Sequence, residues 1–303
     1  MLIFWILFNL FVAAMLALDL GVLNRRPHRV GFREALAWSG VWVALAALFA
    51  VLEFFWHGRD QALQFVTAYT IELSLSLDNL FVFLVTFHYF KVPEQHQHKV
   101  LFWGILGALL MRGVFILAGV GLIQRFSWIT YIFGALLIYS GFRLLRQGKT
   151  KIDPEKNPVL ILFRRILPVT QEYVGGRFFT RRNGLYATPL FVVLLVIETS
   201  DVLFAVDSIP AVLSITLNAF IVYTSTVFAI LGLRSMYFAL AGIMNMFHYL
   251  HYGLSLVLVF IGLKMMGDHY VHVPIEWALA IVLFVLGASI IASLMNPQKE
   301  PVE

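Results

Sequence analysis

Nine long apolar segments, spread along the whole chain, restrict what this sequence can fold into. A helix needs roughly 20 apolar residues to cross the hydrocarbon core of a bilayer. Only 13% of the residues are charged, against about 25% in a typical soluble domain. The sequence therefore predicts an all-α, polytopic membrane protein that forms one transmembrane domain over residues 1–303. The predicted spans are at about 2–23, 35–56, 65–88, 100–122, 128–145, 188–213, 218–240, 251–267 and 275–295.

The distribution of lysine and arginine predicts the orientation of these spans. With the N-terminus outside and the C-terminus inside, 17 of the 22 basic residues fall in cytoplasmic loops or the tail. Three basic residues fall outside, and the other two, Arg112 and Arg234, lie within predicted spans. Because cytoplasmic loops carry an excess of basic residues, this distribution favours an N-out, C-in topology.

One polar stretch interrupts the apolar pattern, at about residues 146–187 between the fifth and sixth spans. Under the predicted topology it is a cytoplasmic loop. Its segment Val159–Leu167 is amphipathic and contains Arg164 and Arg165. Such a segment is typical of an interfacial helix that lies on an anionic membrane surface. A regulatory loop or a loop that docks a partner is the alternative.

Two of the predicted spans carry acids in a shared pattern. The third contains ELSLSLDN over residues 72–79, and the sixth contains DVLFAVDS over residues 201–208. Each segment has an acid, five further residues, a second acid and a small polar residue. The sixth span has an additional acid, Glu198.

The span that follows each acidic segment carries one arginine, Arg112 or Arg234. The pattern therefore predicts that spans three to five repeat as spans six to eight. By the charge distribution the third span runs inward and the sixth runs outward, so the two repeats would have inverted topology. Inverted repeats are typical of secondary transporters, whose substrate site lies near the bilayer midplane between the repeats.

The acids in these spans are costly to insert, at about 2.5–3.5 kcal/mol for each one near a helix centre. We expect Arg112 and Arg234 to compensate part of this charge, each by pairing with one carboxylate. Two arginines cannot neutralise five acids, so the remaining charge calls for protons, cations or both. A purely structural set of salt bridges is the alternative.

The available donor atoms narrow the class of cation. The chain has no cysteine, and neither acidic segment contains a histidine. A site made only of oxygen ligands suits Mn²⁺, Mg²⁺ or Ca²⁺ and disfavours zinc and copper. The predicted metal ligands are Glu72, Asp78, Asn79, Glu198, Asp201 and Asp207, with Ser76 and Ser208 as additional ligands.

Helix geometry limits how these acids can meet. On an ideal helix Glu198 and Asp207 lie on opposite faces, so one straight helix cannot aim both at the same ion. Either the acids divide between two faces or the helix is interrupted. Pro210 could cause an interruption, because its ring removes the hydrogen bond to the Val206 carbonyl. An ordinary proline kink is the alternative.

The two acidic segments also carry a resemblance. ELSLSLDNLFVF over residues 72–83 and IETSDVLFAVDSIPA over residues 197–211 resemble the TerC family of bacterial inner-membrane proteins, in particular its Alx-type members. LDLG at 18–21 and LGLR at 231–234 support the resemblance, which extends over nearly the whole chain. It implies a metal-transporter fold of the LysE superfamily, export of Mn²⁺, and the same acidic residues as the site.

The leading hypothesis is a multi-pass secondary transporter in the bacterial inner membrane that exports Mn²⁺ in exchange for protons by alternating access. No resident cofactor and no nucleic-acid partner are expected; the partners are lipid, the divalent cation and protons. One alternative is an accessory membrane protein that delivers metal to secreted enzymes. A less favoured alternative is an intramembrane hydrolase in which paired acids activate water.

Overall fold

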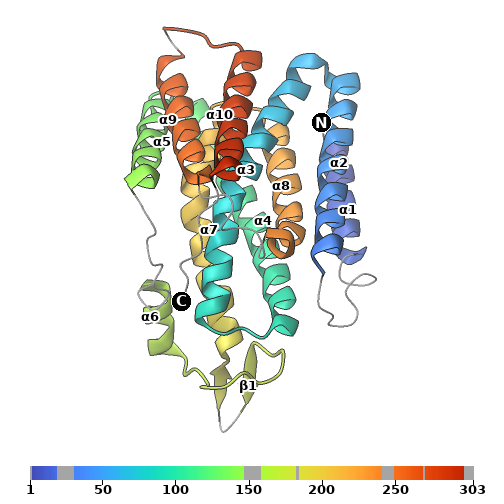
Figure 1. The fold of residues 1–303 in the computed structure, drawn as a ribbon, viewed down its shortest axis with the longest axis vertical. Helices are drawn as coiled ribbons and strands as arrows, with labels where there is room; N and C mark the ends of the chain where they lie inside the picture. Colours follow the sequence, from blue (N-terminus) through green and yellow to red (C-terminus); the bar gives the residue numbers. More distant parts are fainter. Residues whose placement is uncertain are drawn as a thin grey trace.

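The fold is a bundle of long helices with one small helix and a hairpin at one end (Figure 1). The structure is a computed structural model and describes residues 2–18, 31–146, 158–181, 184–240, 249–268 and 270–296. The prediction of an all-α polytopic membrane protein is confirmed. The elements are α1 (Leu2–Leu18), α2 (Phe32–His57), α3 (Arg59–Tyr89), α4 (Glu94–Arg125), α5 (Ile129–Arg146), α6 (Pro158–Ile166), β1 (Phe179–Arg181), β2 (Leu185–Ala187), α7 (Pro189–Leu213), α8 (Ala219–Leu240), α9 (Leu250–Gly267) and α10 (Ile275–Met295).

Eight helices in the described part of the chain are long and apolar enough to cross a membrane, against nine predicted spans. The remaining predicted span corresponds to α1, whose described part covers 17 residues. The last residues predicted for that span lie outside the described ranges. The structure also lengthens the third and fourth spans, because α3 and α4 extend beyond the apolar stretches into polar residues at both ends.

The centre of the bundle is built by helices that the predicted repeat relates to each other. Helix α3 packs against α7 and α8, and α4 likewise packs against α7 and α8. Helix α2 covers α3 and α8 from outside, and α1 lies beside α2 at the edge (Figure 1). If a repeat relates α3 to α7 and α4 to α8, the contact between α3 and α8 must correspond to a contact between α7 and α4. Both contacts are present. The packing is thus compatible with the predicted inverted repeat, which stays a prediction.

Helices α5 and α9 form the most extensive helix pair, and α10 packs against α9 and α3. Glycine makes this close approach possible. A Cβ added at Gly262 on α9 would lie 2.7 Å from the Gly134 carbonyl oxygen on α5, closer than van der Waals contact allows. Small residues at such crossings let two membrane helices pack backbone against backbone.

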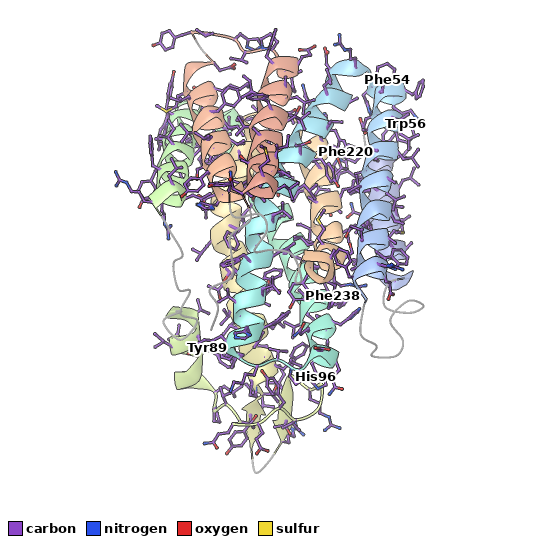
Figure 2. The ribbon with its side chains drawn as sticks, viewed as in Figure 1. Phe54, Trp56, Tyr89, His96, Phe220 and Phe238 are labelled. Carbon is purple, nitrogen blue, oxygen red and sulfur yellow. The ribbon has the colours of Figure 1, made fainter. Side chains whose placement is uncertain are left out.

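The predicted loop between the fifth and sixth spans contains both α6 and the β1–β2 hairpin at one end of the bundle (Figure 1). Helix α6 covers most of the predicted amphipathic segment Val159–Leu167, and its location at the membrane surface stays a prediction. Tyr89 and His96, on either side of the α3–α4 turn, lie at this same end, whereas Phe54 and Trp56 lie at the opposite end (Figure 2). The α3–α4 turn, α6 and the hairpin thus share one end of the bundle, while the predicted orientation of the spans stays a prediction.

Candidate functional site

The centre of the candidate site is one arginine that joins acids from two helices. The Nη1 atom of Arg112 on α4 donates a hydrogen bond to Glu72 Oε2 on α3 at 2.5 Å. Its Nη2 atom donates to Asp201 Oδ1 on α7 at 3.3 Å. All three side chains are buried, with at most 4% of any of them exposed. The prediction that Arg112 pairs with one carboxylate therefore needs correction, since the guanidinium bridges two.

Two polar side chains complete this arrangement. Thr226 on α8 donates a hydrogen bond to Glu72 Oε1 at 3.2 Å, so both oxygens of that carboxylate are bound. The Asn79 amide fits when its nitrogen donates to the Leu75 carbonyl and its oxygen accepts from Arg112 Nη2 at 3.2 Å. The network therefore joins four helices, α3, α4, α7 and α8, through one guanidinium.

Helices α3 and α7 each present a buried polar stripe with the same spacing. Glu72, Ser76 and Asn79 follow one another at helical intervals on α3, and all are buried. Asp201 and Ser208 have the same seven-residue separation on α7 and are also buried. The shared acid pattern in the sequence thus corresponds to a shared burial pattern in the structure.

Some oxygens on these stripes have no partner among the described residues. They are Asp201 Oδ2, Ser76 Oγ and Ser208 Oγ, and each is inaccessible to solvent. A buried polar atom without a hydrogen bond costs about 1–3 kcal/mol. Such an atom in a native structure points to a missing water or ion. A carboxylate oxygen and two hydroxyl oxygens are hard metal ligands of the type that bind Mn²⁺, Mg²⁺ or Ca²⁺.

Glu198 lies on the side of α7 that faces α4. Its carboxylate fills the space beside Gly107, so that a Cβ at this glycine would overlap the carboxylate atoms. Glu198 is one helical turn from Asp201, which makes the two acids neighbours on the helix surface. Within the described residues Glu198 has no hydrogen bond or ion pair, so its carboxyl group is not paired with Arg112.

Asp207 lies on the opposite side of α7 and faces α5. Ser140 on α5 donates a hydrogen bond to Asp207 Oδ1 at 2.6 Å. Arg143, three residues further along α5, is near enough to interact electrostatically with the same carboxylate. The expectation that Glu198 and Asp207 occupy opposite faces is therefore confirmed. The alternative of an interrupted helix is not seen, because α7 is helical through Pro210 to Leu213.

The structure thus brings together only part of the predicted ligand set. Glu72, Asn79, Asp201 and Arg112 are in contact, whereas Asp207 belongs to a separate contact with α5. In the described part of the chain, no three His, Asp or Glu side chains are arranged to hold one metal ion. Asp78 lies on α3, but its side chain is outside the described residues. Arg234 lies on α8, and its compensating role stays a prediction.

Sequence reasoning missed Thr226, Ser140 and Gly107. Thr226 belongs to Thr224-Ser225-Thr226, a run of hydroxyls inside an apolar span, and this run was the available signal. Ser140 and Gly107 are single small residues in apolar surroundings, and their importance depends on which helix lies opposite. That information concerns tertiary contacts and is absent from local sequence patterns.

Comparison with known proteins gives a consistent family. The family model described as the integral membrane protein TerC family matches residues 57–301. A membrane protein of Myxococcus xanthus without an assigned function is 50% identical over 298 residues, covering 98% of this chain and 93% of the relative. A protein of Escherichia coli K12 with the provisional name membrane-bound redox modulator Alx is 46% identical over 293 residues, covering 93% and 91% of the two chains.

A membrane protein of Rickettsia bellii without an assigned function is 39% identical over 293 residues, covering 96% of this chain and 97% of the relative. No solved structure matches the chain at a significant level. The family match extends from the start of α3 to beyond α10 and includes both acidic segments. The chain therefore belongs to the TerC family of integral membrane proteins.

Proposed function

We propose that this protein is a secondary transporter that exports Mn²⁺ through a site between α3 and α7. The observation that carries the proposal is the set of buried oxygens without partners, Asp201 Oδ2, Ser76 Oγ and Ser208 Oγ, on two stripes of equal spacing. A transported divalent cation would satisfy these hard donors. The surrounding apolar helices would exclude water and strengthen the electrostatic attraction.

In this proposal Arg112 occupies the site when no metal is bound. Its guanidinium neutralises one of the two carboxylates, Glu72 and Asp201, so this pair keeps a net negative charge. Entry of Mn²⁺ at Asp201 Oδ2 would loosen the guanidinium from that carboxylate, because the two cations would repel each other at such short range. Arg112 would thus act as an internal competitor that keeps the affinity low enough for release.

Export needs a source of energy. With the cytoplasm negative, moving a divalent cation outward against 100 mV costs about 4.6 kcal/mol. Protons can supply this energy, because a carboxylate that is protonated cannot bind metal at the same time. Glu198 and Asp207, on the two flanks of α7, are the acids available for this exchange beside the buried centre. We therefore include proton antiport, the N-out orientation, the inverted repeat and an inner-membrane location in the proposal.

Two other functions remain as alternatives. An accessory protein that delivers metal to secreted enzymes could use the same residues without net transport. An intramembrane hydrolase needs a water-activating pair of acids, yet the guanidinium of Arg112 lies between Glu72 and Asp201. The name redox modulator belongs to relatives. The present chain has no cysteine, so its own side chains cannot perform thiol–disulfide exchange.

The decisive experiment is uptake of Mn²⁺ into everted membrane vesicles that contain the protein, with and without an acidic interior. Uptake that requires the gradient and is lost in Asp201→Asn would support proton-coupled export. Glu53→Gln is the matched control, because Glu53 is an equally buried acid that pairs with His57 at 2.8 Å on α2 and takes no part in the Arg112 network of the described residues. Vesicles that take up no more Mn²⁺ than empty ones under any gradient would contradict the proposal.

A further inference from the structure

The helix α6 lies beside the first turns of a membrane-spanning helix. Leu160 on α6 is buried together with Val192 and Val196 of α7. The ring of Phe163 lies 5.2 Å from that of Phe191 on α7. These α7 residues belong to the apolar stretch that qualifies as a membrane span. The contacts therefore place α6 next to the level at which α7 enters the membrane.

Several apolar side chains of α6 and of the neighbouring hairpin are exposed. Leu162 is 58% exposed and Ile161 is 45% exposed. Phe179 on β1 and Leu185 on β2 are exposed as well, although the ring of Phe179 also packs on Phe191 at 4.5 Å. An apolar surface beside the entry point of a membrane span is in position to contact lipid.

The charges of this segment suit a negatively charged membrane surface. Between residues 158 and 188 the chain has five arginines and one acid, Glu172. Arg177 and Arg181, whose positions are described, are both exposed. Each basic residue close to an anionic leaflet contributes about 1 kcal/mol of attraction. The combination of exposed apolar residues and arginines is typical of an in-plane membrane anchor.

The same segment is attached to the helices of the candidate site. Tyr173 donates a hydrogen bond to the Phe90 carbonyl at the end of α3, at 2.8 Å. Lys99 on α4 donates to the Gly176 carbonyl at 2.6 Å and lies over the Phe178 ring. Whatever binds the segment therefore acts on the α3–α4 turn and on the start of α7.

We propose that residues 158–181 and 184–188 form an anchor that inserts α6 into the headgroup layer of the membrane, binds anionic phospholipid through Arg177 and Arg181, and holds the adjoining ends of α3, α4 and α7. This inference is independent of transport. It concerns a lipid surface, and it selects the interfacial helix over a loop that docks a protein.

The absence of cysteine allows a direct test on the full-length protein. We would label Leu162→Cys with a fluorophore in vesicles of phosphatidylcholine with and without phosphatidylglycerol. Quenching by nitroxide lipid and by aqueous iodide would then be measured. Phe284→Cys, on the exposed face of α10, is the lipid-facing control, and Tyr270→Cys, in the α9–α10 connection, is the aqueous control.

We expect the Leu162 probe to be quenched by the nitroxide lipid nearly as strongly as the Phe284 probe. We also expect phosphatidylglycerol to reduce iodide quenching, and Arg177→Gln combined with Arg181→Gln to cancel this reduction. Iodide quenching as strong as at Tyr270 in both membranes would overturn the anchor. Lipid contact without dependence on phosphatidylglycerol would overturn the anionic preference. Shielding from both quenchers would indicate a protein on this surface and also overturn the proposal.

Discussion

Ser140 on α5 donates a 2.6 Å hydrogen bond to the Asp207 carboxylate on α7. This bond joins the α5–α9 pair to α7, the helix that carries three of the five predicted site acids. Helix α5 otherwise makes few contacts with α7, so the bond is one of the few specific links between them. Through this bond, a movement of α5 and α9 relative to α7 would change the position or the hydrogen bonding of the Asp207 carboxylate.

We expect Ser140→Ala to weaken Mn²⁺ transport without unfolding the protein. A hydrogen bond to a charged group contributes about 1.5–3 kcal/mol, which corresponds to roughly 10- to 150-fold in binding if the bond forms in only one state. The measurement is the concentration dependence of Mn²⁺ uptake in everted vesicles. Ser289→Ala on α10 is the control, because the Ser289 hydroxyl bonds to the Val285 carbonyl of its own helix. Equal uptake curves for both variants would show that the bond does not position Asp207 for transport.

The space beside Gly107 leads to a second prediction. In Gly107→Ala the new methyl group would overlap the Glu198 carboxylate and force it to move. We expect Mn²⁺ uptake to fall by at least about tenfold, since the displaced Glu198 carboxyl group would no longer have the position that transport requires. Gly121→Ala on the same helix has nothing within 4 Å of the added Cβ and should transport like the unmodified protein. A fully active Gly107→Ala protein would argue against a role for Glu198.

The bridge formed by Arg112 predicts the behaviour of charge variants. Arg112→Ala leaves Glu72 and Asp201 as two buried acids without a cation, and breaking a buried pair in this way costs about 3–5 kcal/mol. We expect a clear drop in the thermal unfolding temperature in detergent. Adding Glu72→Gln and Asp201→Asn to Arg112→Ala should recover much of it, because no uncompensated charge remains.

Mn²⁺ gives the same variant a second readout. If the ion and the guanidinium compete for the same carboxylates, Mn²⁺ should raise the unfolding temperature of Arg112→Ala more than that of the unmodified protein. The triple variant should not respond. A rise of equal size in all three proteins would place the Mn²⁺ site elsewhere.

Tyr173 predicts how the anchor segment responds to pH. Burial of its phenol raises the pKa of Tyr173 to about 12. The pKa of Tyr173 in the folded protein lies above the usual value near 10. The stability that the protonated phenol gives to the folded segment is therefore complete below pH 10 and is lost as the pH rises toward 12. A fluorophore on Arg181→Cys should therefore report an unchanged environment up to about pH 10 and a change above it.

Tyr173→Phe is the control for this titration. It keeps the ring but removes the hydrogen bond to the Phe90 carbonyl, so the fluorophore should lose the step between pH 10 and 12. A step that persists in Tyr173→Phe would assign the transition to another group.

The sequence predicted the membrane class and the location of the polar centre because both depend on local pattern. Long apolar runs specify spans, and acids inside such runs stand out whatever their neighbours. The seven-residue separation of Glu72 from Asn79 and of Asp201 from Ser208 could be read directly, and it corresponds to the buried stripes. Arg112 does pair with acids, as the sequence predicted, but it pairs with two carboxylates and not with one.

Local pattern could not reveal which helices face each other. The double role of Arg112 depends on α7 packing against both α3 and α4, so that one guanidinium reaches acids on two helices. The division of Glu198 and Asp207 between α4 and α5 depends on α7 remaining helical through Pro210. Pro210 lies only three residues before the helix ends, so it removes one backbone hydrogen bond of the last turns without interrupting α7. The partners Ser140 and Thr226 could be identified only from the folded bundle.

The arginine bridge also affects how the protein is made. Glu72 and Asp201 come from helices that enter the membrane at different times during synthesis, and Arg112 is inserted between them. When α7 arrives, a cation is already in place to receive its carboxylate, so the bundle can close without waiting for an ion from the cell.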